Sequence, residues 1–253
     1  MTKEKSVVIV TGGTRGIGRA CVERLYKDGF NVLFTHSNSA NDAQELENTL
    51  STTKTKQVKG FQCDVTELDA ASRIFSEAEK LGEVIGLVNN AGITGKLGPI
   101  TQLTDVDLNK VVEVNLTATI RLCREAAVRW SSNSNGIRRS IVNISSVAAR
   151  TGSPGEYVAY AATKAAVETL SIGLAKELAG VGVLVNAVSP GTIDTTIHAR
   201  AGEPGRARDL GSVELGSGIG EQGAQHVDRG EHRVDRRRAD RTLAGAQFVQ
   251  QRF

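Results

Sequence analysis

The sequence predicts an α/β fold in which one domain is built on a doubly wound parallel sheet. The 253-residue chain has the length of one α/β domain of ordinary size. Short β-branched or apolar runs alternate along it with segments of helical periodicity. A glycine-rich loop separates the first such run from the first helical segment. This alternation requires right-handed crossovers, which place helices on both faces of a parallel sheet.

The first expected strand, at residues 6–11, is an uninterrupted β-branched run, as is typical of a strand buried on both faces. Glycines end it, and a helical pattern continues to about Asp28. The later apolar runs predict strands at 31–35, 57–63, 85–89, 140–144 and 183–188. The segments between them predict helices at 42–50, 67–81, 105–130 and 156–179.

The composition argues against several classes of protein. The net charge of +3 is too small to indicate nucleic-acid or membrane binding. No apolar run is long enough to span a bilayer, and residues 1–5 lead into the first strand without the apolar core of a signal peptide. The three cysteines lack metal-like spacing, and the four histidines are scattered. We therefore expect reduced thiols, no metal site and a cytoplasmic location.

The order of strands and helices ends before the C-terminus. Residues 211–253 contain seven Arg, seven Gly and five Gln, and no apolar run after Val213 is long enough for a buried strand. We therefore expect a domain at 1–210 and a disordered tail at 211–253. The charge cluster at 234–238 leaves a second interpretation open, a basic tail for an acidic partner.

The loop between the first strand and the first helix carries a pattern suited to a dinucleotide. Its glycines, Gly12, Gly16 and Gly18, permit a tight turn and a close approach of the backbone to a pyrophosphate. The N-terminus of the following helix supplies amide groups and a partial positive charge. The spacing differs from G-x-G-x-x-G, but the strand–loop–helix context is the one that such a site requires.

Tyr160 and Lys164 are four residues apart in a predicted helix, fourteen residues after Ser146. Residues at this spacing share a helix face, so the ammonium can lie under the phenol. A free tyrosine has a pKa of about 10, and bringing it near 7 requires about 4 kcal/mol in favour of the phenolate. The ammonium and a cationic cofactor ring could supply this energy.

Taken together, these motifs resemble those of the short-chain dehydrogenase/reductase family, in family order from residue 6 to about 205. The matching segments are Thr11–Gly18, Cys63–Val65, Asn89–Gly92, Asn115, Ser146, Tyr160 with Lys164, and Pro190–Thr192. The resemblance implies a Rossmann fold and NAD(P)-dependent hydride transfer on a carbonyl or secondary alcohol. The bacterial 3-oxoacyl-carrier-protein reductases and glucose 1-dehydrogenases are the members that it resembles most.

The resemblance also implies the roles of the site residues. Tyr160 is the general acid or base, Lys164 lowers its pKa and holds the nicotinamide ribose, Ser146 binds the substrate oxygen, and Asn115 supports a proton-relay water. Asp64 and Val65 contact adenine, Asn89–Gly92 holds the central strand and adenine ribose, and Pro190–Thr192 with Ile193 positions the nicotinamide. The full set of expected cofactor contacts is Gly12, Thr14, Arg15, Gly16, Ile17, Gly18, His36, Asp64, Val65, Asn89, Ala91, Gly92, Tyr160, Lys164, Pro190, Gly191, Ile193 and Thr195.

The end of the second strand bears on the choice of cofactor. An acid there would bind the ribose 2′-OH and repel a 2′-phosphate. This chain has Thr35, His36, Ser37 and Asn38 instead, and Arg15 in the glycine loop could pair with a phosphate. We therefore expect NADP(H), with NAD(H) as the alternative and a solvated role for Arg15 as the other interpretation.

Several assignments stay open at this point. Ser145 competes with Ser146, because the gap to Tyr160 is one residue longer than in many members. Asn115 is either a hydrogen-bonded core amide or the support of the relay. Tyr157 has Ala161 four residues later, so it is expected to line the substrate pocket, with rims at 95–100 and 195–205. These rims do not identify the substrate.

The C-terminus departs from the family, whose members continue with a helix and a seventh strand. We expect that last strand to be missing, which puts the family's homotetramer in doubt. A one-base shift in one choice of codons for residues 234–238 gives Ser-Thr-Gly-Ala, which is similar to the family's last strand, and this suggests a frameshift. The alternative function is a catalytically weak or inactive nucleotide-binding protein on a damaged scaffold.

Overall fold

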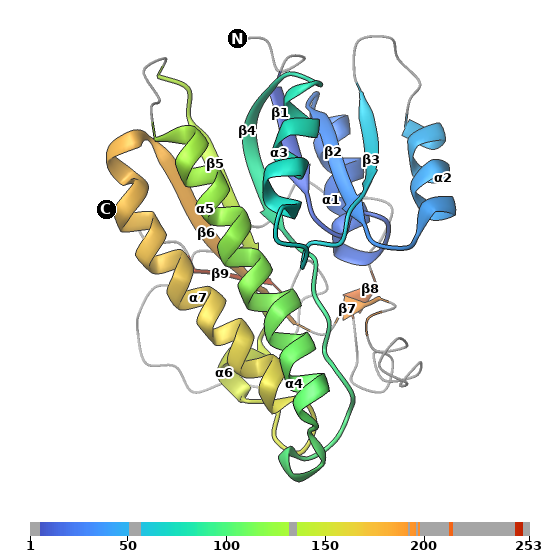
Figure 1. The fold of residues 1–253 in the computed structure, drawn as a ribbon, viewed down its shortest axis with the longest axis vertical. Helices are drawn as coiled ribbons and strands as arrows, with labels where there is room; N and C mark the ends of the chain where they lie inside the picture. Colours follow the sequence, from blue (N-terminus) through green and yellow to red (C-terminus); the bar gives the residue numbers. More distant parts are fainter. Residues whose placement is uncertain are drawn as a thin grey trace, which may run out of the picture.

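The computed structural model describes residues 6–50, 57–131, 136–191, 193–195, 197, 213–214 and 246–249 (Figure 1). Its strands are β1 (Ser6–Val10), β2 (Asn31–His36), β3 (Val58–Gln62), β4 (Glu83–Asn89), β5 (Arg139–Ile144), β6 (Val183–Pro190), β7 (Ile193–Asp194), β8 (Val213–Glu214) and β9 (Ala246–Val249). Its α-helices are α1 (Gly16–Lys27), α2 (Ala40–Leu50), α3 (Ala70–Glu79), α4 (Asp105–Val112), α5 (Ala118–Trp130), α6 (Ala148–Thr151) and α7 (Val158–Leu178). Shorter turns are η2 (Ile100–Gln102), η3 (Glu113–Thr117) and η4 (Ala179–Val181).

The main sheet has the order β3-β2-β1-β4-β5-β6-β9, and its first six strands are parallel. Successive strands are added outward from β1 in one direction up to β3 and in the other direction from β4 onward, so the boundary between β1 and β4 is the topological switch point of a doubly wound sheet. The six strands confirm the predicted fold class and lie within a few residues of the predicted ranges. The predicted long helix at 105–130 is continuous through α4, η3 and α5, with a π-helical turn at η3.

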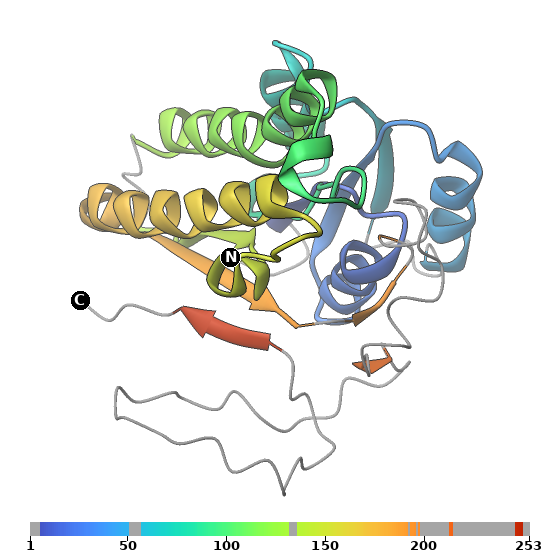
Figure 2. The same ribbon diagram turned by 90° about the horizontal axis from the view of Figure 1, so that it is seen from below.

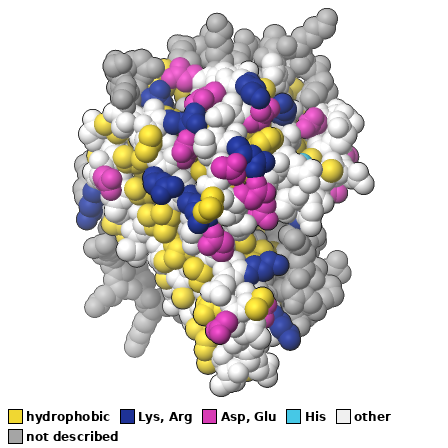
Figure 3. All heavy atoms as spheres, in the orientation of Figure 1, with side chains coloured by type: hydrophobic (Ala, Val, Ile, Leu, Met, Phe, Trp, Pro, Cys, Tyr) yellow, Lys and Arg dark blue, Asp and Glu magenta, His cyan; other side chains and the backbone are white. Residues whose placement is uncertain are grey.

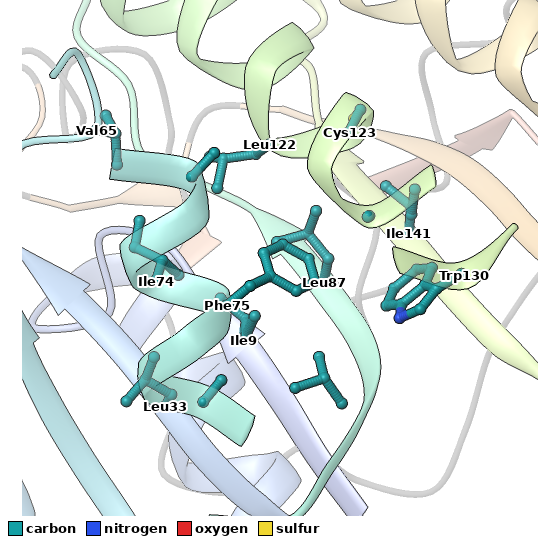
Figure 4. Close-up of a cluster of buried hydrophobic side chains, with 14 of the residues drawn as sticks. Ile9, Leu33, Val65, Ile74, Phe75, Leu87, Leu122, Cys123, Trp130 and Ile141 are labelled. Carbon is teal, nitrogen blue, oxygen red and sulfur yellow. The ribbon is translucent and has the colours of Figure 1, made fainter. Parts of the chain in front are cut away.

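Helices cover both faces of the sheet (Figures 1 and 2). One hydrophobic cluster joins the sheet to α3, α5 and α7, and Figure 4 shows its centre. There Phe75 of α3 and Trp130 of α5 pack edge to face, with ring centroids 6.0 Å apart. A second cluster, on the other face, packs Phe34 of β2 against α1 and α2. The buried β-branched residues of β1 lie between the two clusters, which explains the uninterrupted apolar run.

The C-terminal part of the chain differs in one respect from the expectation. Among the described residues, the main sheet contains no seventh parallel strand, and the family's last strand was expected to be missing. However, β9 pairs antiparallel with β6 through residues 187–190, whereas no strand was predicted after Val213. Its four residues are too short to give a pattern in the sequence. The rest of the predicted tail at 211–253, including the cluster at 234–238, lies outside the described residues except for β8.

No helix in the described ranges is long and apolar enough to cross a membrane. The same ranges contain no cluster of His, Cys, Asp or Glu suited to a metal ion. Cys21, Cys63 and Cys123 are free thiols, and burial raises the pKa of Cys123 to about 12, which makes it unreactive.

Candidate active site

A cavity of about 920 Å³ opens at the carboxyl ends of the parallel strands. This is where open α/β sheets bind their ligands, because the connecting loops diverge at the switch point. Most of the expected site residues line it: Gly12, Thr14, Arg15, Gly16, Ile17, His36, Asp64, Val65, Ala91, Gly92, Ser146, Tyr160, Lys164, Pro190, Gly191, Ile193 and Thr195. Gly18, Asn89 and Asn115 do not line it, and each has a structural contact instead.

The glycine loop connects β1 to α1 with little room for side chains. Gly12 and Gly16 have φ angles of +66° and +53°, which favour glycine. A Cβ atom on Gly18 would lie 2.2 Å from the carbonyl oxygen of Gly12. Asn90 fixes the loop from β4, because its Nδ2 donates to the carbonyls of Thr11 and Gly12, each at 2.9 Å. Gly18 therefore serves close packing of the loop.

The ends of β2 and β3 line the cavity beside the glycine loop, where the Gly13 amide donates to the Thr35 carbonyl at 3.0 Å. His36 ends β2 and is 8% exposed, and burial lowers its pKa, although Glu47 and Asp42 act to raise it. After β3, the Asp64 carboxylate accepts hydrogen bonds from the Thr66 amide at 3.0 Å and the Thr66 hydroxyl at 2.8 Å. Asp64 therefore stabilises the turn that presents Val65 to the cavity.

Asn89 belongs to a buried polar network behind the cavity. Its Nδ2 donates to Asn143 Oδ1 at 2.8 Å and contacts Cys123 Sγ at 3.3 Å. Asn143 Nδ2 in turn donates to Ser171 Oγ at 2.9 Å. The network links β4, β5, α5 and α7, so Asn89 holds the central strand, as the sequence predicts. Asn89 does not line the cavity itself.

Asn115 sits in the π-helical turn η3 and is 1% exposed. Its Oδ1 accepts from the Ile93 amide at 2.9 Å, and its Nδ2 donates to the Ile93 carbonyl at 2.8 Å and to Thr163 Oγ1 at 3.2 Å. Both ends of the amide are therefore occupied. Asn115 therefore fixes the loop after β4 against α7.

Tyr160 and Lys164 lie on one face of α7, with the ammonium 5.7 Å from the centroid of the phenol ring. Lys164 is 5% exposed, and its Nζ donates to the Ile144 carbonyl at 2.7 Å. Burial lowers the pKa of Lys164 to about 8. Burial also raises the pKa of Tyr160, although a hydrogen bond with Ser146 acts to lower it. Desolvation of the phenolate is therefore the largest influence on the pKa of Tyr160.

The two serines after β5 point in different directions. Ser146 reaches the Tyr160 hydroxyl, and its Oγ accepts from the Ala148 amide at 3.2 Å. Ser145 is 2% exposed, and its Oγ lies 3.0 Å from the Lys164 carbonyl and 3.1 Å from Glu168 Oε1. The geometry therefore favours Ser146 over Ser145 as the serine that faces a substrate.

The sequence between residues 6 and 204 matches the family model for short-chain dehydrogenases. The chain belongs to the short-chain dehydrogenase family. It is therefore an NAD(P)-dependent oxidoreductase of the class that acts on CH–OH groups. The match ends close to residue 205, where the sequence was predicted to depart from the family.

Known relatives support the same assignment. The chain is 41% identical over 202 residues to the uncharacterized oxidoreductase YgfF of Escherichia coli K12, covering 79% of this chain and 81% of that protein. It is 34% identical over 217 residues to the 3-oxoacyl-[acyl-carrier-protein] reductase FabG of the same strain, covering 85% of each. A short-chain dehydrogenase from Sphingobium yanoikuyae in complex with NADPH superposes with a TM-score of 0.73 at 29% identity, covering 83% of this chain and 79% of that one.

Some residues around this dehydrogenase site were not predicted from the sequence. Arg121 of α5 donates to the Thr66 carbonyl at 3.1 Å and so holds the turn after β3.

Tyr157, predicted to line the substrate pocket, does line the cavity. The predicted rim at 95–100 instead borders a separate cavity of about 30 Å³ beside Tyr157. Most of the other predicted rim, at 195–205, lies outside the described residues.

Proposed function

We propose that this short-chain dehydrogenase transfers a hydride between NADP(H) and a carbonyl or secondary alcohol substrate, using Ser146, Tyr160 and Lys164. One observation supports this proposal best: the Ser146 and Tyr160 hydroxyls form a hydrogen bond at the cavity wall. The Lys164 ammonium lies beside the Tyr160 ring. The two hydroxyls face the same space, so one substrate oxygen can meet both. The catalytic domain is proposed to span residues 1–210.

The cofactor, when bound, supplies the hydride. The residues of the chain orient the substrate and protonate its carbonyl oxygen in reduction. Burial keeps the Tyr160 proton on the phenol at neutral pH, so in reduction Tyr160 can act as the acid toward a carbonyl oxygen. The Ser146 hydroxyl can stabilise charge that develops on the same oxygen. Lys164 provides a buried ammonium beside the phenol.

Turnover distinguishes this proposal from the alternative of a weakly active or inactive nucleotide-binding protein. Binding would be followed by NADPH fluorescence, and turnover by loss of nicotinamide absorbance on mixing with a panel of ketones and aldehydes. We expect both signals. Binding without oxidation of NADPH by any member of the panel would favour the alternative.

NADP(H) is the proposed cofactor, because Arg15, His36, Ser37 and Asn38 line the adenosine end of the cavity without an acid at the end of β2. The NADPH complex of a related dehydrogenase is consistent with this proposal. Arg15 precedes the first residue of α1, where a phosphate would also be favoured by the helix N-terminus.

Arg15→Ala should weaken NADPH more than NADH by about 1–3 kcal/mol, since only NADPH carries the 2′-phosphate that the guanidinium would bind. Fluorescence titration with each cofactor measures the difference. Arg19→Ala is the matched control, because Arg19 is also on α1 but pairs with Glu23 and Glu45 outside the cavity. Equal losses of NADPH and NADH in the Arg15 variant would remove the argument for a phosphate contact.

A homo-oligomer is proposed from the exposed surface of the long helices. Val106, Ile120 and Val128 are 77%, 42% and 66% exposed on α4 and α5. Figure 3 shows hydrophobic side chains gathered along this face between charged groups. A second copy of the chain would cover them. Sedimentation velocity tests this, and a monomer at micromolar concentration would contradict it.

A further inference from the structure

A carboxylate that does not line the cavity joins the two strand ends behind it. Glu168 lies on α7, one helical turn after Lys164, and its Oε1 accepts from Ser189 Oγ at 2.5 Å. The same oxygen lies 3.1 Å from Ser145 Oγ. The two serines are 2% and 1% exposed; Ser145 directly follows β5, and Ser189 is the next-to-last residue of β6. One carboxylate oxygen therefore bridges both strand ends to α7.

The residues next to these serines are those proposed to act in the site. Ser145 precedes Ser146, which meets Tyr160, and Ser189 precedes Pro190, which lines the cavity. Two backbone hydrogen bonds join the same segments: the Ser145 amide donates to the Val188 carbonyl at 2.7 Å, and the Val147 amide donates to the Pro190 carbonyl at 3.0 Å.

The acceptor in this bridge is charged and its partners are buried, which makes the contacts strong. Hydrogen bonds to a carboxylate are about twice as strong as neutral ones, and screening by water is weak where the serines lie. The Ser145 hydroxyl has one proton and two acceptors within reach, Glu168 and the Lys164 carbonyl, both on α7. Either choice holds the turn that carries Ser146 against the helix that carries Tyr160.

We propose that Glu168 is a positioning residue that sets the distance between the Ser146 turn and the Pro190 strand end. The inference rests on the proposed function for its catalytic consequence, but the bridge itself can be tested without turnover. Loss of the carboxylate leaves Ser145 with the Lys164 carbonyl alone and removes the contact that ties Ser189 to α7, so the two strand ends should separate more often. Ser146 would then meet Tyr160 and a substrate oxygen less often, which lowers kcat more than it raises KM.

The test uses three variants: Glu168→Ala, Ser189→Ala, and the double variant that combines these two substitutions. The control is Glu177→Ala, which removes an exposed carboxylate from the same helix. Hydrogen exchange at the Ser145 and Val147 amides reports the bridge directly, because these amides span the two strands. We expect exchange at both to be about tenfold faster or more in Glu168→Ala, with the Ile141 amide unchanged. In the same variant kcat should fall about tenfold. The double variant should be no worse than Glu168→Ala alone, because the two residues share one interaction.

The outcomes separate the inference from the proposed function. Unchanged exchange at Ser145 and Val147, or equal effects of Glu168→Ala and Glu177→Ala on kcat, would overturn the positioning role even if Tyr160 proves essential. If the native chain shows no turnover, the proposed function fails, while the exchange measurement still decides the bridge. If Glu168→Ala does not fold, Glu168→Gln replaces it, because glutamine keeps the size and one acceptor oxygen but not the charge. It should give a smaller change in the same direction, and no change would contradict the role.

Discussion

Tyr160→Phe should reduce kcat by a factor of about 10² to 10⁴ and leave NADPH bound. The substitution removes the only proton that this side chain can transfer but keeps the ring that packs over Lys164. Its effect should appear in kcat and in kcat/KM equally, because the proton moves only in the transition state. Single-turnover oxidation of NADPH measures the chemical step, and fluorescence titration measures the dissociation constant of the cofactor.

Tyr157→Phe is the matched comparison, since Tyr157 also lines the cavity and directly precedes the first residue of α7. It has no lysine one helical turn later, so its hydroxyl should matter less to turnover. A variant at Tyr160 that keeps near-normal kcat would refute the assignment of the acid. A larger loss at Tyr157 than at Tyr160 would transfer the role to Tyr157.

The fold was predictable because its signals are local. β-branched runs, the glycines that end β1, and the helical periods between strands all follow from the conformational preferences of neighbouring residues. The three glycines of the loop also revealed the ligand end of the sheet. The antiparallel strand β9 was missed, because four residues at a sheet edge are held by pairing with β6 and carry little signal of their own.

The site was predictable where residues share one helix or one loop. Tyr160 and Lys164 are paired by helix geometry alone, and the structure places them as expected. The contacts of Asn115 and Asp64 were harder to foresee, because they depend on backbone atoms from distant segments such as Ile93. Glu168 could have been found from its spacing to Lys164, but nothing in the sequence shows that two serine hydroxyls would meet it.

The pKa of Tyr160 depends on burial as well as on nearby charge. Sequence spacing shows that a cation is near a phenol, but not how much water the fold removes from both. In the structure, burial penalises the charged form of each group, so the pKa of Tyr160 rises and that of Lys164 falls. The site therefore holds a neutral phenol beside an ammonium that loses its proton near pH 8.

Lys164→Met should remove most of the turnover, weaken NADPH binding, and change how stability depends on pH. Methionine fills similar space without the ammonium that lies beside the Tyr160 phenol and would hold the cofactor ribose. In the native chain the folded-state pKa of Lys164 is about 8, compared with about 10.4 for an unfolded lysine. Between these values the unfolded chain binds more protons than the folded one, so the free energy of unfolding rises with pH.

The stabilising contribution is complete above about pH 10.4, and it is lost as the pH falls through 8, where the buried lysine must become charged. Subtracting the Lys164→Met values removes the titration of all other groups. The difference in unfolding free energy between the native chain and the variant should therefore change by about 3 kcal/mol between pH 7 and pH 10.5, in favour of the native chain at high pH.

Urea unfolding at a series of pH values measures this difference. Lys176→Met, at an exposed position of α7, is the control and should show no such change. A pH-independent difference for Lys164→Met would show that the buried lysine does not titrate near 8. At neutral pH, a methionine at position 164 avoids the free-energy cost of burying the Lys164 ammonium. The chemistry proposed for Tyr160 is therefore the best explanation for a lysine at this position.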